Sequence, residues 1–292
     1  MKPSVSDPRG VWQGLAPEAL EREYNARATV PDVDALLRRY RQASDDARMQ
    51  CPEVRTEAYG AHPDECLDLF PVPGEARAPV LVFVHGGYWR ALGRQDSSFM
   101  APMLRRQGVA TVALHYGLAP AVRLEEIVAQ CRRSLVWLWQ HGERLGLDPQ
   151  RMVLAGSSAG AHLAAMMLAD DWLSTTAIPV GALRGAVLAS GLYDLQPLRH
   201  CLPNQWLQLS EPEAEALSPV SHLPRPAVPL TMVVAEHDTS EFRRQSALYG
   251  ERAAAAGCPV KSLDIAGRNH FDVILDWLDP ASALSRSTLA LF

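Results

Sequence analysis

The sequence predicts an α/β fold with a mostly parallel central sheet and helices on both of its faces. From residue 51 onward, short apolar runs rich in valine and leucine alternate with segments whose apolar residues recur at helical spacing. Such alternation is typical of parallel sheets, in which crossover helices cover both faces. Motifs containing glycine, histidine or acidic residues follow four of the apolar runs. In such sheets, ligand and catalytic groups lie beyond the carboxyl ends of the strands.

Residues 1–50 are expected to form an N-terminal arm that packs on the main domain. Pro17, Pro31 and mixed charges divide this arm into short pieces. Asp32 precedes residues 33–48, in which apolar residues fall on one face, so a helix capped by Asp32 is predicted there. We expect the arm to cover an edge of the sheet or the entrance to a site.

Residues 51–292 are expected to form the main domain. Apolar runs predict strands over residues 54–59, 66–72, 80–84, 109–114, 152–155, 185–190, 230–235 and 260–265. Helical spacing predicts helices over residues 97–107, 124–145, 159–169 and 241–256, and a last helix that begins near Phe271. Seven prolines mark residues 194–229 as an insertion over the site, in which a capping box at Ser210 and Glu213 opens a helix through Leu217.

Composition excludes several classes of partner. The 28 basic and 33 acidic residues give a formal charge of −5 without a long run of either sign, so neither a nucleic acid nor a membrane surface is expected as a partner. A small-molecule substrate is expected instead, and the sequence leaves open whether the chain forms a homodimer. Residues 152–169 are uncharged, but their glycines, serines and histidine indicate a buried strand turning into a helix rather than a membrane span.

The cysteines and the N-terminus indicate a cytoplasmic protein. The five cysteines are odd in number and widely spaced, which argues against a disulfide framework and favours a reducing compartment. No Cys-x-x-Cys or His-Glu-x-x-His occurs, so no metal site is expected. Residues 1–7 have no apolar stretch of the kind that a secretory leader needs.

The sequence Gly156-Ser157-Ser158-Ala159-Gly160 matches the pattern Gly-x-Ser-x-Gly between a predicted strand and a predicted helix. A nucleophile placed at a sharp strand-to-helix turn needs flanking glycines, which allow a strained backbone and close helix packing. Ser158 is therefore the predicted nucleophile. A glycine-rich turn of a nucleotide-binding fold is the alternative, but the spacing of a dinucleotide or phosphate loop is missing, so no cofactor is expected.

His85-Gly86-Gly87-Tyr88-Trp89 directly follows another predicted strand. A tetrahedral oxyanion needs backbone N–H donors that no Cβ obstructs, and Gly86 and Gly87 can supply them together with the N–H of Ala159. We expect His85 to brace this loop. Tyr88 and Trp89 are predicted either as core residues or as walls of a pocket.

An acid and a base follow the last two predicted strands, in the chain order serine, acid, histidine. Asp238 is the predicted acid and His270 the predicted base. In such a pair, the carboxylate orients the imidazole and stabilises its charged form. Glu236 and Asp194 remain rival acids. Two other histidines are rival bases: His162, expected to be a buried structural residue, and His237, expected to point elsewhere.

Further motifs occupy residues 23–27, 30–32, 116–120, 158–163, 190–195, 236–238 and 269–272. Together with the two glycine motifs, they resemble the α/β-hydrolase superfamily, and within it the kynurenine formamidases (arylformamidases) and related bacterial esterases. The resemblance extends from about Glu21 to Asp276. Gly117 departs from it, because relatives often carry arginine at that position.

The resemblance implies an α/β-hydrolase fold and the metal-free hydrolysis of an N-formyl aryl amide, with release of formate. An aryl ring needs apolar walls, for which the candidates are Tyr88, Trp89, Tyr193 and Trp206, with Asn204 as a polar contact. No charged residue stands out for the amino-acid end of N-formyl-L-kynurenine. A carboxylesterase or arylesterase for short acyl esters would use the same triad, and a catalytically silent binding protein of the same fold is a further alternative.

Overall fold

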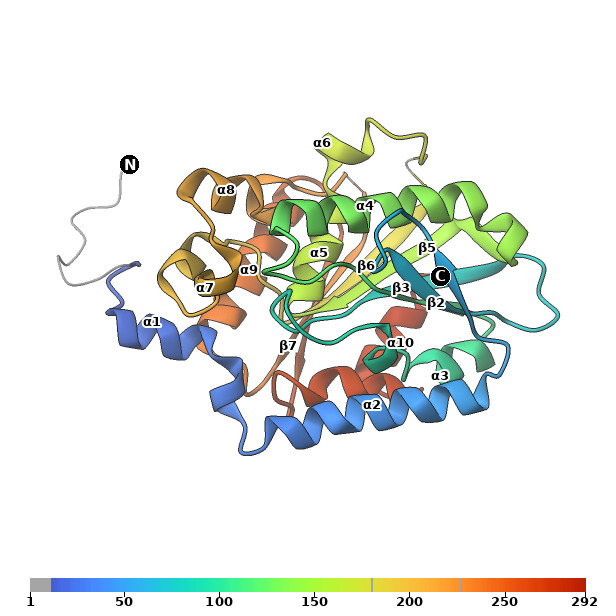
Figure 1. The fold of residues 1–292 in the computed structure, drawn as a ribbon, viewed down its shortest axis with the longest axis horizontal. Helices are drawn as coiled ribbons and strands as arrows, with labels where there is room; N and C mark the ends of the chain where they lie inside the picture. The colour runs from blue at the N-terminus through green and yellow to red at the C-terminus, as the bar shows by residue number, and fades with distance from the viewer. Residues whose placement is uncertain (1–11, 180, 226) are drawn as a thin grey trace.

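An eight-stranded sheet forms the centre of the molecule in the computed structural model, which describes residues 12–179, 181–225 and 227–292 (Figure 1). The strand order is β1-β2-β4-β3-β5-β6-β7-β8, and β2 runs antiparallel to both of its neighbours while the remaining pairs are parallel. The strands are β1 (Arg55–Ala58), β2 (Cys66–Phe70), β3 (Ala78–Val84), β4 (Ala110–Leu114), β5 (Leu147–Ser157), β6 (Leu183–Ala189), β7 (Leu230–Ala235) and β8 (Val260–Ile265). The predicted mostly parallel sheet is thus confirmed. Residues 1–7, which bear on the expected absence of a leader, and Pro226 of the insertion lie outside the described residues.

Ten α-helices are found in the described part of the chain, and short 3-10 helices lie between them. The α-helices are α1 (Pro17–Tyr24), α2 (Val33–Gln50), α3 (Ala101–Arg106), α4 (Leu124–His141), α5 (Ala159–Leu168), α6 (Asp170–Leu173), α7 (Asn204–Leu207), α8 (Glu211–Ala216), α9 (Ser240–Ala255) and α10 (Ala283–Leu289). The 3-10 helices are η1 (Ala26–Thr29), η2 (Arg94–Asp96), η3 (Glu143–Leu145), η4 (Gln196–His200), η5 (Pro219–Ser221) and η6 (Asp272–Leu278). None of the helices described is long and apolar enough to span a membrane.

The sheet is buried on both faces, and β3 shows how its residues alternate between them. Val80 and Val82 belong to the core formed with α4, α5 and α9, whereas Leu81 and Phe83 belong to the core formed with α2, α3, η6 and α10. Successive side chains of a strand point to opposite faces, so a strand covered on both sides is apolar throughout. Figure 1 shows these two helical layers above and below the sheet.

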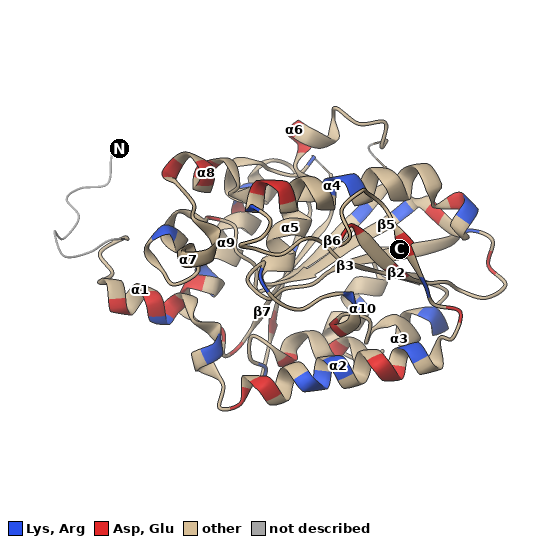
Figure 2. Ribbon diagram, in the orientation of Figure 1, with Lys and Arg blue, Asp and Glu red and all other residues tan. Residues whose placement is uncertain are grey.

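The N-terminal arm contains the predicted helix and is joined to helix α9. Asp32 caps α2 by accepting a hydrogen bond from the backbone N–H of Ala35 at 2.8 Å. Acidic and basic residues are interspersed along the exposed side of α2 (Figure 2). Before α2, the hydroxyl of Tyr24 donates to Glu241 at 2.7 Å and accepts from Gln245 at 2.7 Å, which joins the arm to α9.

Three predicted helices have different bounds in the structure. The helix expected over residues 97–107 begins only at Ala101, because Pro102 fits the first turn of a helix and not its interior. The helix expected over residues 124–145 ends at His141 and is followed by η3. The helix predicted to begin near Phe271 is the 3-10 helix η6, which ends at Leu278. Pro280 then interrupts the chain, and the last helix, α10, begins after its cap, Ser282.

Candidate active site

Ser158 lies at a sharp turn between β5 and α5, as the glycine pattern predicts. Its backbone has φ 55° and ψ −120°, a sparsely populated conformation that typically costs ~1–3 kcal/mol and is found at functional sites. The flanking glycines make the turn possible by allowing close contacts. A Cβ on Gly160 would lie 2.0 Å from the carbonyl oxygen of Val84, and one on Gly156 would lie 2.3 Å from the carbonyl oxygen of Gly160. Larger residues at either position would push α5 off the sheet.

The loop after β3 lies directly against this turn. A Cβ on Gly86 would be 2.7 Å from the carbonyl oxygen of Ser157 and 3.4 Å from the Cβ of Ser158. Gly87 has φ +97°, and a Cβ there would be 2.3 Å from the carbonyl oxygen of Ala91. Neither glycine N–H donates a hydrogen bond to another described residue. Ala159 is the first residue of α5, so its N–H has no acceptor within the helix.

Asp238 and His270 meet beyond the carboxyl ends of β7 and β8. The Nδ1 atom of His270 lies 2.7 Å from Oδ1 of Asp238, and both side chains are almost fully buried. This contact holds the imidazole so that Nε2 remains for a second partner. Of the rival residues after β7, Glu236 and His237 are exposed, and Glu236 accepts from the N–H of Gly267 instead.

The Asp238 carboxylate is stabilised in its charged form by three neighbours. Burial alone would raise its pKa, but the hydrogen bond and charge of His270, with hydrogen bonds from the Ser190 hydroxyl at 2.5 Å and the Ala235 N–H at 2.8 Å, lower it below the usual value. Sequence reasoning missed Ser190. Its position after β6 was the available signal, because β6 and β7 are neighbours in the sheet.

Asp194, the other rival acid, makes no hydrogen bond with His270 among the described residues. Its Oδ1 accepts a hydrogen bond from the N–H of Gln196, and burial raises the pKa of its carboxyl. The rival base His162 is fully buried and satisfied, as expected: Trp89 donates its indole N–H to Nδ1 at 3.2 Å, and Nε2 lies 2.8 Å from the carbonyl oxygen of Leu217.

A cavity of about 380 Å³ contains both Ser158 and His270 in its lining, and we call it the Ser158 cavity. Gly86, Gly87 and His85 also line it. His85 lies with its Nδ1 2.9 Å from the Gly86 carbonyl oxygen and its ring stacked on Tyr116, and burial lowers its pKa to about 3. A histidine that is neutral and packed in this way braces the loop.

Two of the five predicted substrate contacts line this cavity. Tyr88 and Trp206 do so with their rings edge to face, 6.2 Å between centroids, and the indole N–H of Trp206 donates to the Tyr88 carbonyl oxygen. The other three lie elsewhere and correct the prediction. Trp89 is fully buried against His162, Tyr193 is fully buried and stacked on Tyr249, and the amide of Asn204 closes its own loop through hydrogen bonds to residues 199 and 209.

The N-terminal arm contributes a wall that sequence reasoning did not assign residue by residue. Tyr24 and Tyr40 of the arm line the cavity, and the hydroxyl of Tyr88 donates to the Tyr24 carbonyl oxygen at 2.6 Å. The insertion supplies Leu202 and Pro203. The cavity is therefore enclosed by the N-terminal arm, which precedes the first strand, and by the insertion, which separates β6 from β7 in the chain. Its candidate reacting groups instead follow the ends of the strands.

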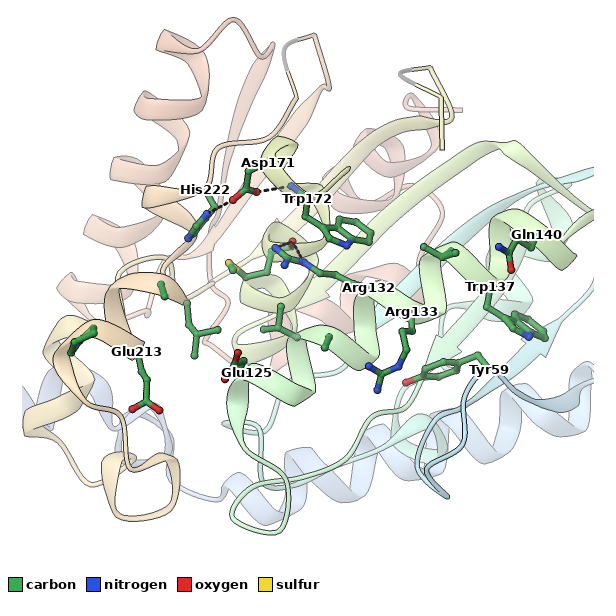
Figure 3. A pocket seen from close by; sticks show the side chains of 17 residues that line it. Tyr59, Glu125, Arg132, Arg133, Trp137, Gln140, Asp171, Trp172, Glu213 and His222 are labelled. Atoms are coloured by element: carbon green, nitrogen blue, oxygen red, sulfur yellow. Dashed lines mark hydrogen bonds and ion pairs between the residues drawn. The ribbon is translucent and has the colours of Figure 1, made fainter. Parts of the chain in front are cut away.

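A larger hollow of about 880 Å³ lies on the outer side of α4 (Figure 3). Its lining includes Arg132 and Trp172, with the guanidinium carbon 5.1 Å from the ring centroid, and Trp137. It contains no member of the predicted triad or oxyanion loop. The groups able to perform acyl transfer are in the smaller, more enclosed cavity, so we place the candidate active site there.

Comparison with known proteins agrees with this fold. The family described as alpha/beta hydrolase fold matches residues 81–273. A kynurenine formamidase of Danio rerio is 32% identical over 96% of this chain and 98% of its own length.

Two solved structures have the same fold. A putative thioesterase from Silicibacter sp. superposes with a TM-score of 0.79 at 28% identity, over 93% of this chain and 98% of that one. A thermophilic carboxylesterase cloned from a metagenomic library superposes with a TM-score of 0.66 at 20% identity, over 95% of both chains. The second likeness concerns the fold alone.

Proposed function

The chain belongs to the α/β-hydrolase family and, within it, to the family of the kynurenine formamidases; from this premise we propose that it is a serine hydrolase that cleaves N-formyl-L-kynurenine to kynurenine and formate. The observation that carries the proposal is the 2.7 Å contact between His270 and Asp238 beside a cavity that His270 shares with Ser158. A nucleophile, a base and an orienting acid in one site are what acyl transfer requires.

In the proposed first step, the Oγ of Ser158 attacks the formyl carbon while Nε2 of His270 takes the hydroxyl proton. Negative charge then develops on the formyl oxygen. The N–H groups of Gly86, Gly87 and Ala159 are the proposed donors to this oxyanion. Asp238, whose pKa lies below its usual value, stabilises the charged imidazolium.

In the proposed second step, the carbon–nitrogen bond breaks and the His270 imidazolium gives its proton to the departing arylamine. An aniline nitrogen is a poor leaving group without that proton, so the acid role of the histidine matters more here than it does for an ester. Water, deprotonated by His270, then releases formate and regenerates the Ser158 hydroxyl.

The shape of the cavity supports an aryl substrate with a small acyl group. Tyr88 and Trp206 form an aromatic wall on the side of the arm and the insertion. Gly86 lies so close to Ser158 that even a Cβ would collide with the neighbouring backbone, which leaves little room beside the nucleophile. A carboxylesterase for short acyl esters would use the same groups, and it is the second candidate.

We also propose that the enzyme works in the cytoplasm. All five cysteines are free thiols, and four of them are buried. Free thiols in such number are typical of proteins kept in a reducing compartment.

The proposal is tested by measuring kcat/KM of the purified protein on N-formyl-L-kynurenine and on p-nitrophenyl acetate. We expect the formamide to be cleaved with a kcat/KM of about 10⁴ M⁻¹s⁻¹ or more. Ser158→Ala should abolish both activities, while Ser262→Ala, an exposed serine on β8, should keep both. Turnover of the activated ester alone would favour the esterase, and turnover of neither would favour the silent binding protein.

A further inference from the structure

Four charged residues line the Ser158 cavity: Glu21, Arg27, Arg90 and Asp96. Asp96 is already paired, because its Oδ1 accepts from Nε of Arg41 at 2.7 Å. Arg27 is paired too, with its Nη2 2.9 Å from Oδ1 of Asp34. The carboxylate of Glu21 accepts from the N–H of Leu202. These contacts tie three of the four groups to the protein itself.

Arg90 differs from the other three. Its side chain makes no hydrogen bond and no ion pair with any residue in the described ranges, and the residue is exposed at the cavity. Its guanidinium carbon lies 4.3 Å from the centroid of the Trp206 ring. A guanidinium stacked on an aromatic face keeps its five N–H donors at the edge of its plane, where they remain available to an acceptor.

The backbone fixes Arg90 relative to the proposed oxyanion donors. Its N–H donates to the carbonyl oxygen of Gly87 at 3.1 Å, and the N–H of Ala91 donates to the same oxygen at 3.1 Å. Trp206, on which the guanidinium rests, is in turn anchored to the Tyr88 carbonyl oxygen at 3.1 Å. One tight turn, which begins at Gly87 beside the glycine that lies against Ser158, therefore carries a cation that is not paired with any described residue.

We infer that Arg90 is a specificity-determining residue that binds a carboxylate on the leaving-group side of the substrate. The inference rests on the proposed function and deepens it. With the formyl carbon at Ser158 and the aryl ring against Tyr88 and Trp206, an acidic side chain on the ring extends toward the guanidinium. A guanidinium binds a carboxylate through two parallel N–H···O bonds, which confers both orientation and affinity. The substrate class is thus an aryl formamide whose aryl group carries a carboxylate.

The test compares a formamide that carries a carboxylate with a truncated form that lacks it. N-formyl-L-kynurenine has an α-carboxylate and an α-ammonium group, and 2-formamidoacetophenone has the same aryl ketone without the amino-acid group. In Arg90→Gln, we expect the ratio of kcat/KM for N-formyl-L-kynurenine over 2-formamidoacetophenone to fall about 10- to 100-fold, mainly through KM. Arg90→Lys should recover only part of the ratio, because an ammonium cannot form the paired contact.

Arg39→Gln serves as the matched control, because Arg39 is an exposed arginine of α2 that does not line the cavity. It should leave the ratio unchanged. Equal losses on both substrates in Arg90→Gln would show that Arg90 only supports the loop, and no loss on either would show that the carboxylate is not bound there. Either result would overturn the inference while leaving the proposed formamidase activity intact.

A separate pair of substrates keeps the two proposals distinguishable. If the wild-type enzyme cleaves p-nitrophenyl acetate but neither formamide, the proposed function fails. The charge preference is then measured with 4-acetoxyphenylacetate against 4-acetoxyphenylacetamide, which place an anion or a neutral amide on the leaving group. A preference for the anion that disappears in Arg90→Gln supports the inference, and equal rates for the two esters in the wild-type enzyme overturn it.

Discussion

The two ends of the Ser158 cavity are built in different ways. At the reacting end, Ser158, Asp238 and His270 follow strands of the sheet, are buried, and are held by short hydrogen bonds or a strained turn. At the far end, Arg90 and Trp206 are more exposed: the guanidinium rests on the Trp206 ring, and the indole N–H of Trp206 donates to the Tyr88 carbonyl oxygen. Under the proposed function, the chemistry depends on the rigid sheet edge, whereas substrate choice depends on the loops and segments that cover it.

The largest expected effect concerns the orientation of the base. Asp238→Asn should lower kcat about 10³- to 10⁴-fold with a much smaller change in KM, because the amide cannot hold His270 in the required tautomer or stabilise its charge. Steady-state kinetics on both the formamide and p-nitrophenyl acetate measure this. Glu236→Gln, which alters the exposed rival acid, is the control. A loss of less than tenfold in Asp238→Asn would contradict the assignment of the acid.

The second effect concerns a buried histidine that supports the reacting end. Burial lowers the pKa of His162 to about 4 from its ordinary 6.5. Between these values the unfolded chain binds a proton that the folded chain does not, so the free energy of unfolding falls as the pH falls through this window. The stabilising contribution is fully present above about pH 6.5.

His162→Gln removes that titration while keeping an amide that can reach Trp89 or Leu217. The drop in unfolding free energy between pH 7 and pH 5 should become about 2 kcal/mol smaller than in the wild-type protein. Urea unfolding at the two pH values measures it. An identical drop in both proteins would mean that His162 is not a neutral buried group.

At the far end of the cavity, the aromatic wall should have a smaller effect on turnover. Trp206→Ala should lower kcat/KM for the aryl formamide about tenfold, because the ring surface and the support for Arg90 are both lost. Ethyl formate has no ring, so the kcat/KM of Trp206→Ala for this ester should fall less. Trp137→Ala alters the separate hollow on α4 and should keep the activity on both the aryl formamide and ethyl formate. If Trp137→Ala were the more damaging variant, the assignment of the substrate cavity would be wrong.

The smallest effect concerns the attachment of the arm. Tyr24→Phe removes a hydroxyl that bonds to both Glu241 and Gln245, and should lower the unfolding free energy by about 1–2 kcal/mol. Tyr249→Phe is the matched control, because that hydroxyl is buried without a hydrogen-bond partner among the described residues. Denaturant unfolding compares the two. If Tyr24→Phe and Tyr249→Phe had the same free energy of unfolding, the Tyr24 hydroxyl would not fasten the arm.

Local sequence patterns predicted the reacting end because its geometry is encoded in adjacent residues. Gly156 is required by contacts within the turn itself, Gly160 lies against the neighbouring strand β3, and Asp238 and His270 follow apolar runs whose strands end at the same edge. Helix ends were predicted less well where proline changed the first turn, as at Pro102.

The aromatic contacts were predicted only in part because neighbouring side chains of a loop point in different directions. Tyr88 and Trp89 both have positive φ values, 50° and 57°, yet Tyr88 lines the cavity and Trp89 is fully buried against His162. Ser190 was missed because its partner Asp238 is 48 residues away in the chain and adjacent only across the sheet.

The sequence by itself predicted the parallel sheet, the placement of Ser158, Asp238 and His270 after strands of that sheet, and the glycines around Ser158, since these follow from hydrophobic periodicity and local steric limits. Only the tertiary structure decided which residues enclose the Ser158 cavity. The arm, the loop after β3 and the insertion are far apart in the chain, and long-range packing brings Tyr24, Arg90 and Trp206 to one wall. It also left the Arg90 guanidinium without a hydrogen bond or ion pair to any residue that the structure describes, because pairing between charges depends on distances that no local pattern specifies.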